Sequence, residues 1–431
     1  MHAFYRGKVE TTLKCAVRSF DDFGIWYTPG VAAPCREIHT DPAKAFDYTN
    51  KANSIAVVSD GSRVLGLGNI GAVAGLPVME GKALLFKYLG GVGAFPIVLD
   101  TQDTEEIIQA VKWIAPGFGG INLEDFANPK CFTILDRLRE ELDIPVWHDD
   151  QQGTAAITLA GVINAVKVVG KALDAVSFCV VGAGAANIAF VRVLIAAGIP
   201  AENIILVDSR GILHPDREDL EEAKDENPYK WKYAHETNGE RRTGDLATAI
   251  EGTDVLVAAS KPGPDTIRKE WLATMNGDAV AFLMANPVPE LWPWEAKEAG
   301  VRVVGTGRSD FPNQINNSIG FPGIFRGTLD VFATTITDEM AIAAAEAIAA
   351  TAEAKGLHEE YIVPTMMETE VFINEAVAVG TKAIEQGLAR RPLEPDALRA
   401  EAESKIRHAQ AETRILMEHG QIAPAPEVDV S

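Results

Sequence analysis

The stretch AVSFCVVGAGAAN, residues 175–187, decides the fold class. Its apolar run Ala175–Val181 predicts a buried strand, and an Ala-rich helical pattern follows the glycines to about Ala197. Later apolar runs predict further strands of the same sheet at Ile204–Val207, Val255–Ala258, Val280–Leu283 and Val301–Val304. Strands that alternate with helices form a parallel sheet, so we predict a doubly wound, Rossmann-type domain here.

The glycine turn in this stretch has the spacing of a dinucleotide site. Gly182 allows a tight turn, and Gly184 lets a pyrophosphate approach the backbone where the next helix begins. Asn187 stands where the fingerprint has Gly or Ala, so an ordinary strand–helix turn is the alternative. Asp208, at the end of the next strand, could bind the adenosine ribose of NAD, whereas Arg210 could accommodate the extra phosphate of NADP. The predicted cofactor positions here are Gly182, Gly184, Ala185, Ala186, Asn187 and Asp208.

A second series of short strands precedes this domain, and each strand ends in acid. The strands are predicted at Ile55–Val58, Pro96–Leu99, Ile121–Leu123 and Pro145–Trp147, and the acids are Asp60, Asp100, Glu124 with Asp125, and Asp149 with Asp150. The carboxyl ends of parallel strands share one edge of a sheet, so we expect these carboxylates to converge at one crevice. For Asp60 and Asp100, a role as helix N-cap is an equal alternative.

The two adjacent acidic pairs indicate a metal site. Glu124–Asp125 and Asp149–Asp150 could hold Mg²⁺ or Mn²⁺, which prefer carboxylate and water oxygens. Without a cation these carboxylates would repel one another, and some would have to stay protonated. Solvated surface acids are the alternative that spacing alone leaves open.

Several strings in the chain resemble the malic enzymes. They are YTPGVA (27–32), SDGSRVLGLGNIG (59–71), PVMEGKALLF (77–86), NLEDF (122–126), HDDQQGTA (148–155), GAGAAN (182–187), NPVPE (286–290) and NQINNSIGFPG (313–323). The resemblance is to the short form of the family, and it runs from about Tyr27 to Gly327 and beyond. It implies an NAD(P)-dependent malate dehydrogenase (decarboxylating), which oxidises malate to pyruvate and CO₂.

The resemblance also implies roles for single residues. It assigns metal binding to Glu124, Asp125 and Asp150, general acid catalysis to Tyr27, general base catalysis to Lys82 with Asp149 beside it, substrate binding to Arg63, Asn286 and Asn317, and cofactor contacts to Thr154, Asn286 and Asn317. His148 lies beside the acids, but the family chemistry gives it no proton to move, and we interpret it as a buried structural imidazole.

A metal-assisted lysine base is electrostatically reasonable. Lowering a lysine pKa by about 3 units requires about 4 kcal/mol. At an effective dielectric of about 20, a dication about 5 Å away contributes roughly 6 to 7 kcal/mol, against about 4 kcal/mol from an opposing carboxylate at about 4 Å. Without the family strings, Lys82 and Tyr27 would be interpreted as a surface lysine and a core aromatic.

Composition limits the partners. The chain has 431 residues, and 39 Lys+Arg against 61 Asp+Glu give a net charge of −22, which disfavours nucleic acid. No apolar run is long enough to span a membrane, and the four cysteines are too scattered for a disulfide framework. We therefore expect a cytoplasmic protein with reduced thiols. The family resemblance implies a small dicarboxylate substrate and a homodimer or larger homo-oligomer.

The predicted architecture is α/β throughout. An N-terminal α/β substrate and metal domain (1–154) precedes the Rossmann-type NAD(P)-binding domain (155–384), and a C-terminal helix with a loose tail follows (385–431). Helices are predicted from Asp338 to about Lys355 and from Pro395 to about His419, and an irregular surface excursion from Asp216 to Arg242.

Two other functions compete with the malic enzyme interpretation. One is an NAD-dependent 2-hydroxy-acid or amino-acid dehydrogenase that does not decarboxylate its product. The other is a non-catalytic nucleotide-sensing protein, since a fold alone never proves activity. A sensor, however, would have no need for Tyr27, Lys82 and four acids together.

Overall fold

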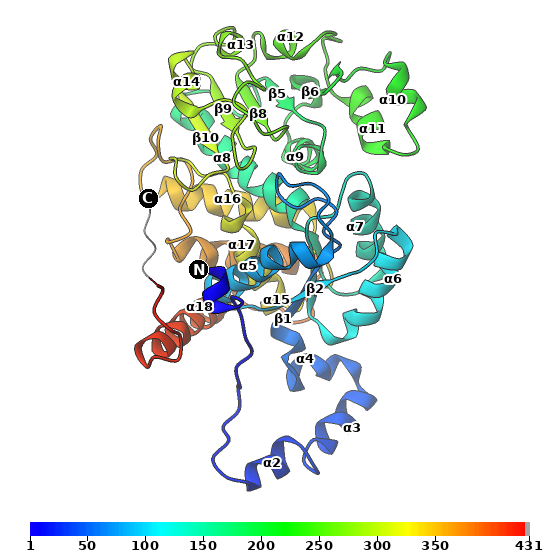
Figure 1. Ribbon diagram of the computed structural model, residues 1–431, viewed down its shortest axis with the longest axis vertical. Coiled ribbons are helices and arrows are strands. Elements are labelled where there is room, and N and C mark those ends of the chain that lie inside the picture. Colours follow the sequence, from blue (N-terminus) through cyan, green and yellow to red (C-terminus); the bar gives the residue numbers. More distant parts are fainter. Residues whose placement is uncertain (427–431) are drawn as a thin grey trace.

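Four parallel strands form the first sheet, in the order β2-β1-β3-β4 (Figure 1). They are β1 Ser54–Ser59, β2 Gly93–Val98, β3 Gly120–Leu123 and β4 Val146–His148. Every residue of the central strand β1 is buried, because helices cover both faces of the sheet, and this explains its continuous apolar sequence. The computed structural model describes residues 1–426, and within them the four predicted strands are confirmed to within a few residues.

The second sheet has the order β10-β9-β8-β5-β6-β7. Its strands are β5 Phe178–Val181, β6 Ile204–Asp208, β7 Gly211–Ile212, β8 Val255–Ala258, β9 Val280–Leu283 and β10 Val303–Thr306. All pairs are parallel except β6 with the short strand β7. Strand order reverses around β5, as in a doubly wound sheet, and the carboxyl ends of the strands at this switch point are where such sheets bind ligands. The last strand begins at Val303 instead of Val301, because the Val301 N–H donates to the Ala296 carbonyl in the preceding turn.

Helices cover both sheets. The first sheet carries α5 Ala72–Gly90 on one face and α6 Thr104–Ile114 and α7 Lys130–Glu141 on the other. The second sheet carries α8 Thr154–Val168 and α9 Ala185–Ala196 on one face, and α12 Leu246–Ile250, α13 Lys269–Leu272 and α14 Pro293–Glu298 on the other. Short helical turns complete the connections at η1 Pro42–Lys44, η2 Asn50–Asn53, η3 Ala115–Gly117, η4 Asp149–Gly153, η5 Ala201–Asn203 and η6 Asn317–Ile319.

After the second sheet the chain returns to the first. The four last helices are α15 Phe321–Asp330, α16 Asp338–Glu353, α17 Glu370–Glu385 and α18 Pro395–Glu418, and they confirm the two predicted helices, α16 and α18. Phe321 and Phe325 of α15 and Val379 of α17 share one core with Ile55 and Val57 of β1. Both helices were assigned to the Rossmann-type domain, and the limits 1–154, 155–384 and 385–431 stay a prediction.

The segment from Asp216 to Arg242 is more ordered than predicted. It contains α10 Glu218–Glu222 and α11 Pro228–Glu236. Asn227 caps α11, and Tyr233 and Ala234 of this helix are buried. The expectation of an irregular surface excursion was therefore wrong for α11, because its aromatic side chains face inward. Of the predicted loose tail, residues 427–431 lie outside the described residues.

A segment near the N-terminus projects from the body. It contains α2 Asp21–Trp26, α3 Ala32–Thr40 and α4 Ala45–Tyr48, and follows the short α1 His2–Tyr5. Figure 1 shows α2 and α3 well apart from both sheets. We call residues 9–49 the N-terminal arm. Among residues 1–426, no helix combines the length and the apolar composition of a membrane span.

The four cysteines differ in burial. None of the four takes part in a disulfide. Cys131 and Cys179 are buried, and burial raises the pKa of each thiol to about 12, which leaves them unreactive near neutral pH.

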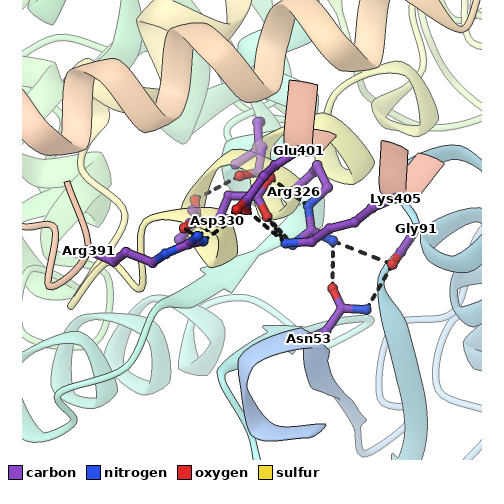
Figure 2. A network of polar contacts seen from close by, with 9 residues as sticks. Asn53, Gly91, Arg326, Asp330, Arg391, Glu401 and Lys405 are labelled. Atoms are coloured by element: carbon purple, nitrogen blue, oxygen red, sulfur yellow. Dashed lines mark hydrogen bonds and ion pairs between the residues drawn. The ribbon is translucent and has the colours of Figure 1, made fainter. Parts of the chain in front are cut away.

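A buried ion-pair network fastens the last helix to the first sheet (Figure 2). Arg326 and Asp330, one turn apart on α15, are both fully buried and form two hydrogen bonds of 3.0 and 2.6 Å. Arg326 also donates to Asn53 Oδ1 at 2.6 Å, beside β1. Lys405 of α18 donates to the same Asp330 carboxylate, and Glu401 accepts from Lys405 at 3.3 Å. Each buried charge therefore has a partner, and removal of one would leave the others uncompensated.

We predict that Asp330→Ala lowers the free energy of unfolding by about 3–5 kcal/mol, because Arg326 would remain buried and unpaired. Urea denaturation of the variant and the wild type measures this. The control is Arg407→Ala on α18, which removes an exposed pair with Glu403 and should cost less than about 1 kcal/mol. Equal effects of the two substitutions would contradict the account.

Candidate active site

Lys82 lies between two buried carboxylates. It projects from α5, and its Nζ is 3.0 Å from Glu124 Oε1 and also donates to Asp149 Oδ2. The Phe321 ring covers the ammonium at 4.4 Å from Nζ to the ring centroid. Glu124 follows β3 and Asp149 follows β4, so the parallel register brings both acids to the carboxyl edge of the first sheet. Trp147 Nε1 donates to Asp149 Oδ1 at 3.1 Å and fixes that side chain.

Three carboxylates lie together at the same edge. One oxygen from each of Glu124, Asp125 and Asp150 lies within 4.8 Å of the others. The Asp125 N–H donates to Asp150 Oδ2 at 2.8 Å, and Asn122 Nδ2 donates to Glu124 Oε2 at 3.0 Å, so backbone and amide hold the group. Asp125 Oδ2 is buried without a hydrogen-bond partner among the described residues. A hard divalent cation fits this set, because it takes carboxylate oxygens and would satisfy the unpaired one.

The electrostatics of the cluster also favour a bound cation. Burial, followed by the neighbouring acids, raises the pKa of Asp125 to about 8. Burial also raises the pKa of Glu124, with a smaller contribution from the nearby acids, and burial alone raises the pKa of Asp150. Burial opposes the charge on Lys82, but Asp149, Glu124 and Asp150 outweigh it, and the net pKa of Lys82 is raised. Among the described residues, the carboxylates therefore share one buried positive charge, the ammonium of Lys82.

Two of the expected acids are not in this cluster. Asp60 accepts hydrogen bonds from the Ser62 N–H and hydroxyl at 2.9 and 2.6 Å and pairs with Lys130. Asp100 is exposed at the end of β2. The expectation that all strand-end acids converge was thus wrong for Asp100, since β2 is an edge strand. Asp60 is close enough to raise the pKa of Asp125, but it pairs with Lys130 and does not join the three carboxylates. His148 is buried, as expected for a structural imidazole, and burial lowers its pKa to about 3.

The predicted substrate residues lie around the acids. The Arg63 N–H donates to the Asp125 carbonyl at 2.9 Å, and its exposed guanidinium is close enough to lower the pKa of Asp150. A Cβ on Gly66, in the same loop, would lie 2.8 Å from the Asn286 carbonyl, so the two loops touch. Asn317 begins η6, and its Cβ would lie 3.3 Å from a Cβ on Gly153, one residue before Thr154.

The nucleotide turn faces this cluster. Asn128, close after Asp125, donates from Nδ2 to the Ala183 carbonyl at 3.4 Å, and η4 packs against α9. Gly182 has φ +100, and a Cβ there would lie 2.7 Å from the Ala259 carbonyl, so only glycine fits. A Cβ on Gly184 would meet nothing within 4 Å, which leaves space before the first turn of α9. That space and the free N–H groups of Ala185 and Ala186 suit a pyrophosphate.

Asn187 braces the turn from inside. Its Nδ2 donates to the carbonyls of Val181 and Gly182 at 2.7 and 2.9 Å, and the side chain is buried. The usual fingerprint has a Gly or Ala here, which lets helix and strand pack closely, whereas this chain has a buried amide. The departure from the fingerprint is compatible with the turn, because the amide replaces close packing by two hydrogen bonds.

Tyr27 is the predicted site residue that the single chain does not bring to the cluster. It follows α2 at the far end of the N-terminal arm, and 72% of its surface is exposed. Figure 1 shows α2 far from α5, which carries Lys82. Several apolar side chains of the arm are also exposed: Leu13, Val17, Phe20, Phe23, Ile25, Trp26 and Val31.

Several residues of the site were missed from the sequence. Phe321 and Trp147 contact Lys82 and Asp149, and Glu290 accepts from Ser260 and from the Ala285 N–H, which fixes the loop of Asn286. Glu290 and Phe321 stand in the strings NPVPE and NQINNSIGFPG, so those strings were the available signal. Arg217 and Lys230 surround Asp208 and come from the segment that was expected to be irregular.

Comparisons with known proteins agree with this arrangement. The malic enzyme N-terminal domain matches residues 6–139, and the malic enzyme NAD binding domain matches residues 151–292 and 300–384. The NAD-dependent malic enzyme of Geobacillus stearothermophilus is 51% identical over 385 residues, which cover 89% of this chain and 78% of that protein. The bifunctional malic/malolactic enzyme of Bacillus subtilis (strain 168) is 47% identical over 396 residues, covering 92% and 94%.

Solved structures are similar over nearly the whole chain. The crystal structure of Entamoeba histolytica malic enzyme superposes with a TM-score of 0.96 at 44% identity, covering 99% of this chain and 88% of that one. The malic enzyme from Pyrococcus horikoshii Ot3 gives 0.91 at 50% identity, covering 96% and 95%. The chain therefore belongs to the malic enzyme family.

Proposed function

We propose that the chain catalyses the oxidative decarboxylation of malate to pyruvate and CO₂ with reduction of NAD⁺ or NADP⁺. The observation that carries this proposal is the position of Lys82 Nζ, held between Glu124 and Asp149 at the edge that the nucleotide turn faces. A simple dehydrogenase also needs a base beside its nicotinamide. The additional carboxylates of Asp125 and Asp150 supply what decarboxylation requires, which is a site for a cation beside the reacting oxygen.

Lys82 acts as the general base for the C2 hydroxyl. Glu124 and Asp149 both hold the proton on its amine in the chain alone. Their charge must therefore be offset before the amine can release that proton to water and then accept the proton of the C2 hydroxyl. Glu124 pairs with Lys82 and is also one of the three clustered carboxylates. If Glu124 binds a cation, less of its negative charge is left to keep the proton on Lys82. Asp149, fixed by Trp147, keeps the amine oriented throughout.

Glu124, Asp125 and Asp150 would hold Mg²⁺ or Mn²⁺. When bound, such a cation supplies a Lewis acid for the C2 oxygen and lowers the proton affinity of Lys82. Arg63 suits a substrate carboxylate, because a guanidinium forms paired hydrogen bonds to it. Asn286, whose carbonyl lies against the Gly66 loop, and Asn317, whose Cβ lies against Gly153, would contact substrate and nicotinamide, and Thr154, next to Gly153, would contact the cofactor.

Tyr27, as the general acid that protonates C3 of the enol, would come from a second copy of the chain. Within one chain it is on the exposed arm, and the apolar side chains of the arm need a surface to cover them. The outer face of α5 offers one, because Val73, Ala74, Pro77, Leu84 and Tyr88 are exposed along it at helical spacing. The proposed homodimer thus completes each site with a tyrosine from the partner. The expected cytoplasmic location stays a prediction.

The proposed reaction can be tested with the purified chain. With malate, Mn²⁺ and NAD⁺ or NADP⁺, we expect reduced cofactor, pyruvate and an equal amount of CO₂. EDTA should abolish the reaction and added Mn²⁺ should restore it, because the carboxylates then lack their cation. No turnover with either cofactor would refute the proposal, and a stable keto acid without CO₂ would favour the non-decarboxylating dehydrogenase.

Lys82→Ala should lower kcat by about 100- to 10,000-fold, the usual contribution of a general base. Binding of NAD(P)H, followed by its fluorescence, should be retained, since Lys82 lies on α5, which packs on the first sheet, whereas the nucleotide turn belongs to the second sheet. Lys87→Ala is the matched control, because this lysine lies on the same helix in an exposed pair with Glu412. Activity in Lys82→Ala equal to that of the control would rule out the base.

A mixture of two inactive variants tests the shared site. Tyr27→Phe and Lys82→Ala, unfolded and refolded together in equal amounts, should recover about a quarter of the wild-type activity, because half of the dimers are mixed and each has one intact site. Each variant refolded alone should stay inactive. No recovery, with mixed dimers demonstrated by differently tagged chains, would place Tyr27 and Lys82 of one site in the same chain.

A further inference from the structure

Asp208, at the end of β6, is surrounded by cations. Arg217 Nη1 donates to its Oδ1 at 2.8 Å, and Arg217 Nη2 to its Oδ2 at 3.2 Å. The Arg210 N–H donates to Oδ1 at 2.9 Å, and Lys230 Nζ to Oδ2 at 3.3 Å. Asp208 adjoins the nucleotide turn, because the Gly182 N–H donates to the carbonyl of Val207. The carboxylate expected to receive the adenosine ribose thus already has other donors.

A carboxylate accepts about four hydrogen bonds, two at each oxygen. Asp208 has two donors at Oδ1 and two at Oδ2, and only 8% of its side chain is exposed. The ribose hydroxyls of NAD would have to displace one of these donors. A displaced Arg217 would be costly, because its guanidinium is 9% exposed and also holds Asp219.

The other two cations remain accessible. The Arg210 side chain is 68% exposed and pairs with Asp219 at 3.2 Å, and the Lys230 side chain is 25% exposed. Lys230 also lies on a fixed element, since its neighbour Tyr229 donates to Asp136 of α7 and its ring packs at a tilt against Phe132, with 4.7 Å between the ring centroids. Three cations face the two carboxylates of Asp208 and Asp219, which leaves one positive charge in excess.

We infer that Arg210 and Lys230 bind the 2′-phosphate of NADP, and that Asp208 anchors these cations instead of binding the ribose of NAD. The inference rests on the proposed function, because it names which of the two cofactors fits the same nucleotide turn. A phosphate offers acceptors to both exposed donors, and Arg217 screens it from the Asp208 charge. The ribose diol of NAD would offer hydroxyl donors to a carboxylate whose acceptor positions are filled.

Two adenylates test this without the reaction. Calorimetric titration of the full chain with 2′,5′-ADP, which carries the 2′-phosphate, and with 5′-AMP compares the two ribose ends. We expect 2′,5′-ADP to bind at least about tenfold more tightly. Arg210→Ala and Lys230→Ala should each reduce that ratio by weakening 2′,5′-ADP binding. Lys230→Ala should leave 5′-AMP binding equal or tighter, since it frees an acceptor position on Asp208.

The control is Lys232→Ala, which removes the same charge from the same helix at a side chain that is 51% exposed and directed to Glu236. It should leave both affinities unchanged. Equal binding of the two adenylates, or weakening of both by Lys230→Ala, would overturn the inference and leave the proposed reaction standing. Failure of both to bind would refute the nucleotide site itself, and the inference with it.

Discussion

The candidate active site depends on one interaction, the pairing of a single buried amine with several buried carboxylates. Lys82 stands among Glu124, Asp149 and Asp150, all of which burial drives toward the neutral form. One ammonium cannot neutralise that many acids, and the carboxylates keep its proton in place. The site is thus electrostatically incomplete by itself. This incompleteness gives it affinity for a divalent cation and makes the basicity of Lys82 dependent on that cation.

Helix α15, which covers Lys82, also contacts residues from early and late in the chain. Phe321, the first residue of α15, lies over the ammonium, and Arg326 and Asp330 at the end of α15 hold Asn53 and Lys405 (Figure 2). The return of α15 to the first sheet therefore links the position of the base to the C-terminal helix. A site between two sheets requires an element that links them, because a close-packed interior deforms little and so keeps its residues in fixed positions.

The nucleotide end of the site has the opposite charge imbalance, with more positive than negative side chains. Around Asp208 the cations outnumber the acids, whereas around Lys82 the acids outnumber the cation. The two ends of the crevice therefore suit ligands of opposite charge, a phosphate at one and a metal ion at the other. The overall charge of −22 gives no hint of this local separation, because net charge averages over the whole surface.

Local patterns in the sequence determined the strands, the nucleotide turn and the acids, because each of these signals lies within a few adjacent residues. The strings around Lys82, Glu124 and Asp150 are enough, from the sequence alone, to indicate the family and the candidate metal ligands. The sequence alone could not show that Lys130 pairs with Asp60, or that Arg217 and Lys230 pair with Asp208 and occupy its acceptor positions. It also could not show that Tyr27 lies on an arm away from Lys82. These facts depend on which distant side chains meet across helices and loops, and charge pairing between such side chains leaves no periodic signal along the chain.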